Sequence, residues 1–478
     1  MTAAAPARHD WLAFYVLCMG VLMIVLDTTI VNVALPSIKA DLGFSETALA
    51  WVVNAYMLTY GGFLLLAGRL GDLLGHRRVF LLGLTAFTVA SLLCGLAASQ
   101  RMLVAARAAQ GLGGAVVSAV ALSLIMDLFT APADRARAMG IYGFVCAGGG
   151  SVGVLLGGLL TSTLSWHWIF LVNLPIGVLV ALATLRLVPA TRKPFEGRLD
   201  VAGAASVTLA LTLAIYSVVH GNEAGWTSPA TLGVLAVALV LLVAFVTIEA
   251  RIRAPLIPLG LFRHRNLTVA SLIGVLWCAA MFAWFFLSAL YMQQVLGYDP
   301  FRVGLAFLPA NLVMAACSVG LSARLVMRFG IRLPLGAGLT MAATGLALFA
   351  RAPVDGRFVV DVLPAMMLLG LGAGIAFNPV LLAAMGDVAP DQSGLASGVV
   401  NTAFMMGGAL GLAVLASLAA ARTSTLTSAG ASTLAALNGG YHTAFLAGAC
   451  AAAAAALAGA VLLRPQAMVP TAAGATGH

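Results

Sequence analysis

The chain has 478 residues, of which 62% are hydrophobic and only 9% are charged. A soluble protein carries about 25% charged residues, so this composition and the mean hydropathy of +1.05 exclude an ordinary soluble domain and predict a polytopic membrane protein. The net charge of +9 does not indicate nucleic-acid binding, because the basic residues lie in short loops, where they set membrane orientation. All six cysteines fall in apolar segments, so we expect no disulfide framework and no metal site.

Apolar segments of about 20 residues, the length that crosses a bilayer, recur fourteen times along the chain. We therefore predict an all-α membrane protein with fourteen transmembrane helices. The expected spans are about 11–35, 47–68, 79–98, 102–126, 138–161, 168–188, 200–220, 230–250, 267–292, 304–325, 333–350, 360–383, 395–419 and 443–463.

Two basic connectors divide these spans into groups. We expect a cytoplasmic N-terminus (1–10), a six-helix half (11–190), a linker with two extra transmembrane helices (191–260), a second six-helix half (261–464) and a disordered cytoplasmic tail (465–478). With a cytoplasmic N-terminus, the inner loops collect roughly three times as many Lys and Arg residues as the outer loops, as the positive-inside rule requires. This pattern predicts a multi-pass protein of the cell membrane with both termini in the cytoplasm.

The first expected span contains an acid. Asp27 lies within an apolar segment that begins near Trp11 and that we expect Pro36 to end. A carboxylate at this depth costs roughly 2.5–3.5 kcal/mol on insertion scales, and such residues usually face a cavity and a partner. Asp27 is therefore a candidate functional residue. The alternative is a fixed ion pair that only locks helices together.

The loop Gly68–Arg78 after the second span is similar to Ala323–Arg332 after the tenth. Two six-span halves with a matching basic loop indicate a duplicated transporter with an inserted pair of helices. Asp72, the acid of the loop Gly68–Arg78, can pair with nearby arginines or lie at a helix N-terminus of the opposite half. Such a contact would stabilise one conformation of the transporter. The alternative is that the loop, with its tight turn, only fixes the membrane topology. The candidate gate residues are Gly68, Asp72, Gly75, Arg77 and Arg78.

Arg107 in the fourth span is the expected partner of Asp27. At the rise of an α-helix, Asp27 lies about 13 Å and Arg107 about 10 Å below the outer ends of their spans. An arginine beside a carboxylate favours the charged acid, and a proton or a cationic substrate that displaced it would let the site alternate between occupants. We predict that Asp27 is the proton or cation acceptor and Arg107 its modulator, with a purely structural pair as the alternative.

The fifth span carries a ladder of glycines. Gly149, Gly153 and Gly157 recur every four residues and share one face, which permits close packing against a neighbouring helix. We expect this face to form part of the interface between the halves, and plain packing is the alternative.

Other polar and aromatic residues are candidates for lining a cavity. Ordinary interhelical hydrogen bonds explain the polar residues equally well, and lipid-facing packing explains the aromatic ones. Glu223, expected in the loop after the seventh span, is a solvated acid or an acid that attracts cations to a vestibule. The cavity candidates are Asn32, Asn54, Gln110, Trp284, Phe285, Asn311, Asn378 and Asn401.

Four stretches together resemble the major facilitator superfamily, and within it the fourteen-helix drug:proton antiporters of the EmrB/QacA type. The resemblance runs from about Trp11 to about Arg464 and depends on the order and spacing of motifs that are weak individually. These stretches are Leu26–Pro36, the loop Gly68–Arg78, Arg107–Gly113 and Trp166–Gly177.

The resemblance implies that Asp27 and Arg107 take part in proton coupling and that the loop Gly68–Arg78 acts as a conformational gate. It also implies that the glycines of the fifth span, with Gly140 as a further member, form the antiporter glycine ladder. Val154 stands where that family's motif has a proline, which weakens the case for export over import.

These observations predict proton-coupled export of lipophilic, often cationic small molecules by alternating access. No cofactor is expected, because the proton gradient drives transport. The partners are then the substrate, protons and membrane lipid, and we expect a functional monomer. A proton-coupled symporter of a nutrient is the main alternative, and a non-transporting sensor or scaffold is a further one. An enzyme is not expected, since no phosphate-binding loop, metal cluster or nucleophile motif is present.

Overall fold

The computed structural model describes residues 8–129, 132–189, 200–225, 227–252, 255, 257–386, 388 and 393–464, and the regular elements in them are helices. An N-terminal group of helices comprises α1 (Arg8–Leu42), α2 (Glu46–Leu49), α3 (Trp51–Leu74), α4 (His76–Gly95), α5 (Gln100–Leu128), α6 (Pro132–Thr163), α7 (Trp168–Leu171) and α8 (Asn173–Leu187). A separate pair follows, α9 (Val201–Ala224) and α10 (Pro229–Arg251).

The C-terminal group contains seven α-helices, interrupted by short 3₁₀ and π-helical turns. These are η1 (Leu259–Arg263), α11 (Arg265–Leu290), η2 (Tyr291–Val295), α12 (Pro300–Ala316), η3 (Cys317–Leu321), α13 (Ser322–Phe329), α14 (Arg332–Phe349), η4 (Phe358–Val362), α15 (Leu363–Met385), α16 (Ser393–Ser428) and α17 (Thr433–Leu462).

Twelve helices among the described residues are long and apolar enough to cross a membrane, fewer than the fourteen predicted. The other two expected spans correspond to shorter apolar stretches, Val152–Thr163 within α6 and Pro300–Ala316, which is α12. The α-helical part of α12 has only 17 residues because the chain passes into the π-helical turn η3 at Cys317. The described part of the chain is therefore an all-helical membrane protein, and these two apolar stretches are shorter than the other twelve.

The first span is longer than the sequence indicated. α1 continues through Pro36 to Leu42, so the expectation that Pro36 ends this span is wrong. A proline lacks the N–H that would bond within the helix, but transmembrane helices tolerate it because neighbouring helices and local adjustments satisfy the freed backbone groups.

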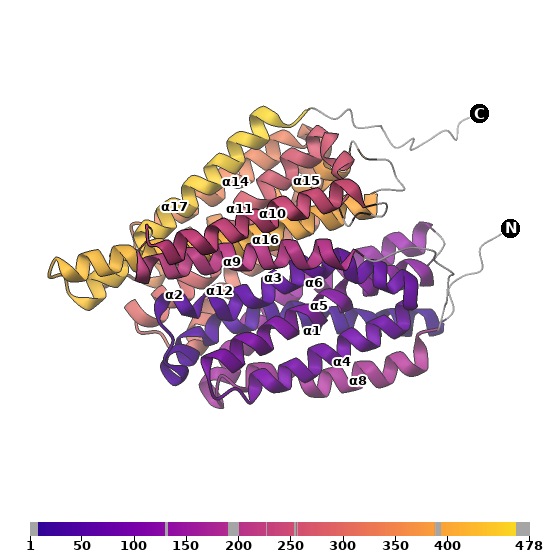
Figure 1. Ribbon diagram of the computed structural model, residues 1–478, viewed down its shortest axis with the longest axis horizontal. Helices are drawn as coiled ribbons and strands as arrows, with labels where there is room; N and C mark the ends of the chain where they lie inside the picture. The colour runs from indigo at the N-terminus through magenta and orange to yellow at the C-terminus, as the bar shows by residue number, and fades with distance from the viewer. Residues whose placement is uncertain are drawn as a thin grey trace.

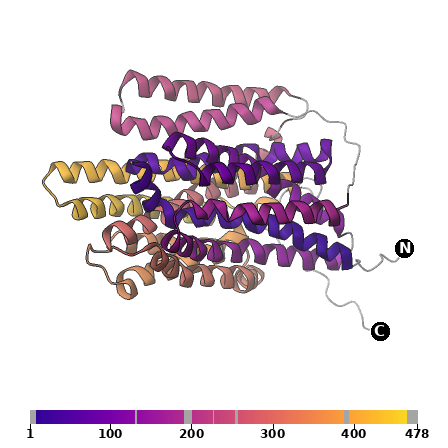
Figure 2. The same cartoon turned by 90° about the horizontal axis from the view of Figure 1, so that it is seen from below.

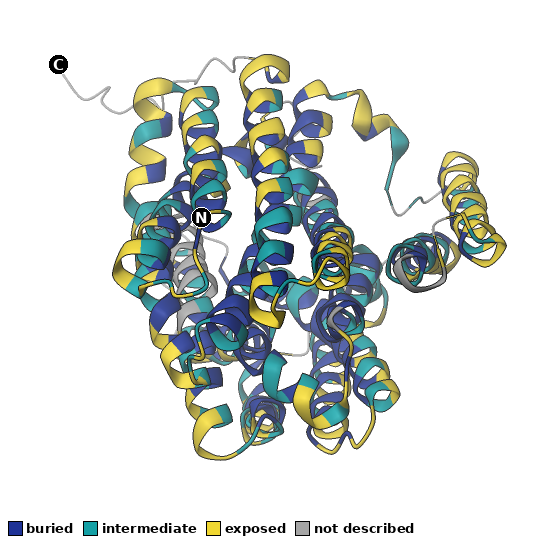
Figure 3. Ribbon diagram, turned by 90° about the vertical axis from the view of Figure 1, so that its left-hand side faces the viewer, coloured by how far each residue is buried: buried dark blue, intermediate teal, exposed yellow. Residues whose placement is uncertain are grey.

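The N-terminal and C-terminal groups lie side by side, and the two chain termini leave at the same end of the bundle (Figure 1). The pair α9–α10 lies apart from the rest, at the edge of the bundle (Figure 2). α9 packs on α3 and α16, whereas α10 packs mainly on α9. Exposed residues lie mostly on outward-facing surfaces and helix ends, and buried residues lie between the helices (Figure 3).

Two helix pairs form most of the junction between the groups, α6 with α12 and α3 with α16, and small residues bring their backbones together. A Cβ atom at Gly158 would lie 2.6 Å from the carbonyl oxygen of Pro300, and one at Gly61 would lie 2.7 Å from the Cβ of Met405. A hydrogen bond also crosses the junction, because the Gln293 side chain donates to the Val33 carbonyl at 2.9 Å.

The internal repeat is visible in the backbone. Gly75 ends α3 with φ 92°, and Gly330 ends α13 with φ 74°. Their N–H groups donate to the Gly71 and Val326 carbonyls at 2.9 and 2.8 Å. Glycine adopts this left-handed region without a steric penalty, which explains why both loops carry it at the same position.

The glycine face of α6 packs on α1 rather than on the other group. A Cβ at Gly157 would lie 2.5 Å from the Ile30 carbonyl oxygen, and one at Gly149 would lie 2.9 Å from Val25. The prediction that this face forms the interface between the halves is therefore wrong, although the adjacent Gly158 contacts α12. The surroundings of Gly140 lie outside the described residues.

Replacing Gly157 by alanine is expected to destabilise the protein by about 1–3 kcal/mol, because the new methyl group overpacks against the backbone of α1. Thermal unfolding in detergent measures this change. Gly233→Ala on α10 is the matched control, since no atom lies within 4 Å of a Cβ there and alanine favours the helix. Equal melting temperatures for the two variants would contradict the proposed contact.

Candidate functional site

Asp27 of α1 and Arg107 of α5 form a buried ion pair. The Nη1 atom of Arg107 lies 2.6 Å from Oδ2 of Asp27, and the two side chains are 1% and 0% exposed. The predicted juxtaposition of the two residues is therefore present. Full burial matters because a charge in the bilayer is tolerated only when it is partnered.

The second oxygen of Asp27 is also engaged. Its Oδ1 atom accepts hydrogen bonds from the Gln110 side chain at 2.7 Å and from the Asn173 side chain at 3.0 Å. The amide nitrogens of Gln110 and Asn173 also lie 2.8 and 3.4 Å from Oγ of Ser91. Asp27 thus accepts three hydrogen bonds from side chains of two different helices, α5 and α8.

Arg107 is held on the other side. Its Nε donates to the Val52 carbonyl at 2.9 Å, and its Nη1 also donates to Oε1 of Gln110 at 2.6 Å. The guanidinium lies 4.3 Å from the centre of the Tyr56 ring and 5.7 Å from that of Phe170. Stacking on aromatic faces stabilises a desolvated cation, so the arginine has both polar and π partners.

Chemically, the site is a charge-balanced carboxylate that can take up one proton. Protonation would remove the ionic attraction to Arg107 and convert one acceptor of Asp27 into a donor. The hydrogen bonds from Gln110 and Asn173 would then have to rearrange. Removing one charge of a buried pair leaves the other unpaired, which is strongly unfavourable, by about 3–5 kcal/mol.

Three partners in this network were not identified from the sequence: Asn173, Ser91 and Tyr56. Asn173 lies in the stretch Trp166–Gly177, which was noted only for its family resemblance. α7 ends at Leu171 and α8 begins at Asn173, so the break between these short helices places the amide beside Asp27. The sequence signal that could have identified Asn173 is its position as a polar residue directly after an aromatic-rich segment.

The other polar candidates of the first half do not join the network. Asn32 donates only to the Thr28 and Thr29 carbonyls of its own helix, both at 3.4 Å. Asn54 is fully buried, and neither of its amide atoms has a hydrogen-bond partner among the described residues.

The candidates of the second half are dispersed. Asn378 donates to the Ser318 carbonyl at 2.7 Å, and Asn401 donates to the Ser397 carbonyl of its own helix at 3.0 Å. Asn311 is 2% exposed, and its amide nitrogen has no partner in the part of the chain that is described.

The two aromatic candidates pack inside the C-terminal group. Trp284 is fully buried, and the centre of its ring lies 6.1 Å from that of Phe307. Phe285 stacks on the Phe307 ring with the ring centres 5.4 Å apart.

The backbone at Glu223 is helical, because α9 continues to Ala224 and ends at Gly225 with φ 90°. The expectation that Glu223 lies in a loop is therefore wrong, since the helix ends at the glycine that adopts the left-handed conformation. The side chain of Glu223 lies outside what the structure describes.

The gate candidates lie around the end of α3. Gly68 is in α3, Gly75 forms the turn, and Arg77 of α4 donates to the Leu185 carbonyl of α8, within the same group. Arg78 is exposed. The side chain of Asp72 lies outside the described residues, so its predicted contact with the opposite half stays a prediction.

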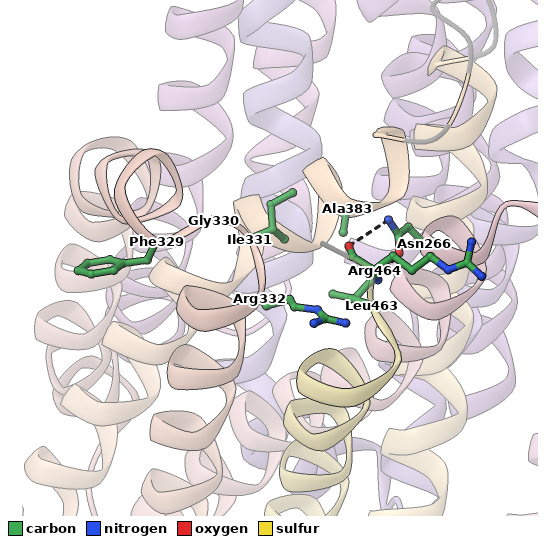
Figure 4. Close-up of a pocket in the computed structure, with 8 residues that line it drawn as sticks. All are labelled: Asn266, Phe329, Gly330, Ile331, Arg332, Ala383, Leu463 and Arg464. Carbon is green, nitrogen blue, oxygen red and sulfur yellow. Dashed lines mark hydrogen bonds between the residues drawn. The ribbon is translucent and has the colours of Figure 1, made fainter. Parts of the chain in front are cut away.

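A pocket lies at the corresponding loop of the C-terminal group (Figure 4). There the Asn266 side chain accepts from the Arg464 N–H at 2.8 Å and donates to the Arg464 carbonyl at 3.4 Å. These two hydrogen bonds connect the segment after α17 to the start of α11. None of the predicted site residues lines the pocket.

Replacing Asn173 by alanine removes a hydrogen bond to a charged group, which contributes about 1.5–3 kcal/mol. We expect the free energy of unfolding in detergent to fall by this amount. Asn32→Ala is the control, because Asn32 is equally buried but bonds weakly to its own helix. A loss in the control as large as in Asn173→Ala would contradict the assigned contact.

Comparison with known proteins fits this architecture. A solved structure described as an auto-inhibited POT family peptide transporter superposes with a TM-score of 0.66 at 18% identity, covering 98% of this chain and 99% of the other. A bacterial homologue of the human lysosomal transporter Spinster, described as inward-facing and unoccupied, gives a TM-score of 0.65 at 17% identity, with 96% and 98% covered. At such identities these similarities indicate the fold alone.

Closer relatives are found by sequence. The chain is 40% identical over 441 residues to the puromycin resistance protein pur8 of Streptomyces alboniger, covering 91% of this chain and 87% of that protein. It is 40% identical to the cephamycin export protein CmcT of Amycolatopsis lactamdurans, with 86% and 85% covered. It is 36% identical to a lincomycin resistance protein of Streptomyces lincolnensis, with 87% and 85% covered. The model of the Major Facilitator Superfamily matches residues 17–412, and the chain belongs to this superfamily.

Proposed function

We propose that this protein exports drug-like small molecules across the cell membrane in exchange for protons. The relatives named for puromycin, cephamycin and lincomycin support the choice of cargo. The Asp27–Arg107 pair is the observation on which the coupling depends, because it is the fully buried ion pair among the described salt bridges.

In the proposed cycle, Asp27 binds one proton from the outer side and releases it to the cytoplasm. The charged pair is neutral as a whole, and protonation leaves Arg107 as an unpaired cation. An unpaired cation favours a conformation in which water reaches it. The proton therefore changes which side of the membrane the site faces, and cargo moves in the opposite direction.

The glycine face of α6 supports a route from the site to the interface. A Cβ at Gly153 would lie 2.9 Å from the Leu26 carbonyl, directly before Asp27, and the adjacent Gly158 contacts Pro300 of α12. We infer that a shift of α1 on protonation moves α6 against α12. The loop Gly68–Arg78 would then act as the gate, with Gly75 as its turn and Arg77 tied to α8.

We also propose that all fourteen expected helices cross the membrane, as in the EmrB/QacA type. α6 is a continuous helix of 32 residues, and α12, η3 and α13 follow one another without a break from Pro300 to Phe329. An even number of crossings agrees with the two termini leaving at one end (Figure 1). In this assignment α9 and α10 are the inserted pair, both termini are cytoplasmic, and the monomer is the working unit.

Substituting Asp27 by asparagine tests the proposal in proteoliposomes with an imposed pH gradient. We expect uphill puromycin transport to fall at least about tenfold, to the level of protein-free vesicles, because the proton site is lost. Exchange of puromycin without a pH gradient should persist, since cargo binding does not need the carboxylate.

The control is Asp299→Asn, a half-exposed acid that caps α12 through its side-chain oxygen, a role that asparagine also fills. Undiminished proton-driven transport by Asp27→Asn would refute the coupling role. Movement of puromycin in the same direction as the proton would instead support the symporter, the alternative that Val154 in place of the family's proline keeps open.

A further inference from the structure

We propose that the cargo is an uncharged molecule rich in hydrogen-bond acceptors rather than a permanent cation. This inference rests on the proposed export function and specifies its substrate class. It combines the charges available inside the bundle with the buried polar groups that lack partners.

Within the described part of the chain, the centre of the bundle offers a cation no carboxylate that is not already paired. Of the acidic residues within the described helices, Asp27 alone lies more than one turn from a helix end. Its two oxygens already accept from Arg107, Gln110 and Asn173, and the side chain is 0% exposed. A permanent cation in this low-dielectric region would have no anionic partner and would meet the charge of Arg107.

The interior does offer unused hydrogen-bond donors. Each of the two main helix pairs at the junction carries a buried asparagine whose amide nitrogen has no partner among the described residues, Asn54 on α3 and Asn311 on α12. Asn54 shares a helix face with Met57 and Gly61, which contact α16. Asn311 lies seven residues, two helical turns, after Gly304, which contacts Val154 of α6.

The chemistry of these atoms specifies the ligand. On the helices of the two junction pairs and on α11, the unsatisfied N–H donors are Nδ2 of Asn54, Nδ2 of Asn311 and the indole N–H of Trp284. The one acceptor-only atom without a partner on these helices is Oδ1 of Asn54. Four unsatisfied hydroxyls on the same helices can donate as well as accept: those of Tyr56, Thr161, Ser271 and Thr402. Native proteins contain few such groups because each costs about 1–3 kcal/mol when buried. An acceptor-rich molecule with carbonyl, nitro or ether oxygens would satisfy them. The Met57 and Phe282 side chains, which both lie against Gly408 of α16, supply apolar surface between the two groups of helices, and methionine adapts readily to different ligands.

The experiment uses the full chain in proteoliposomes with an imposed pH gradient and two probes. Chloramphenicol is uncharged and acceptor-rich, whereas ethidium is a permanent cation. We expect chloramphenicol to be transported and ethidium to move no faster than in protein-free vesicles. Transport of ethidium at a comparable rate would overturn the inference and leave proton-coupled export standing. Failure of the pH gradient to drive puromycin or either probe would overturn the proposed function and the inference together.

Variants separate a binding role from a folding role. We expect Asn54→Leu and Asn311→Leu to raise the KM for chloramphenicol about tenfold while raising the melting temperature, because each removes an unsatisfied buried amide. Asn438→Leu is the matched control on α17. Its amide nitrogen donates to the Ala352 carbonyl at 3.0 Å, whereas its amide oxygen has no partner among the described residues. Because the donated bond is lost, this control should lower the melting temperature, and it should leave the KM unchanged. An unchanged KM in the first two variants would overturn the inference.

Discussion

Two opposite charges meet at a fully buried position among the N-terminal helices, and the arrangement of these helices depends on their pairing. Asp27 and Arg107 are hydrogen-bonded into a polar cluster whose members come from five helices, α1, α3, α4, α5 and α8. This one cluster therefore fixes the five helices relative to one another. A lipid environment provides no hydrophobic force between helices, and association there depends on packing and on polar contacts. The cluster therefore stabilises the helix arrangement and is also the place where a proton can disturb it.

Close backbone approach makes such a disturbance consequential. At Gly153 and Gly157 the backbone of α6 lies directly against the carbonyl groups of Leu26 and Ile30 in α1, which leaves little room to absorb a small shift. Packed interfaces respond to small shifts by changing between discrete arrangements rather than by deforming gradually. The inter-group contacts of α6 with α12 lie one residue from this glycine face. The proposed proton site and the interface proposed to move are therefore connected through a single helix, α6.

The sequence predicted the features that follow from the lipid environment itself. Lipid penalises an unpaired charge, so a buried Asp27 required a partner, and the rise of a helix placed Arg107 at matching depth. It did not predict Asn173, because the position of an uncharged amide depends on where α7 ends and on the rotation of α8, which hydropathy does not report. Likewise, a four-residue glycine period identifies a helix face but not its partner, and the face of Gly149, Gly153 and Gly157 was assigned to the wrong neighbour. The end of α9 was misplaced for a similar reason, because the polar residues before Gly225 remain helical.

The buried polar groups around Asp27 and those at the junction of the helix groups differ in whether they have hydrogen-bond partners. Around Asp27, both carboxylate oxygens, Nε and Nη1 of Arg107 and the amide of Gln110 have hydrogen-bond partners. Such satisfaction is the condition under which a charged cluster is stable in a low-dielectric medium. At the junction of the groups, Asn54 and Asn311 remain unsatisfied, although apolar side chains of similar size would remove that penalty. A penalty of this kind persists where the surrounding structure offsets it and where the group has a use. The satisfied cluster suits a site whose occupant is a proton, because it changes only in protonation. The unsatisfied asparagines suit a site whose occupant leaves on every cycle, because the amides must be without partners whenever the cargo is absent.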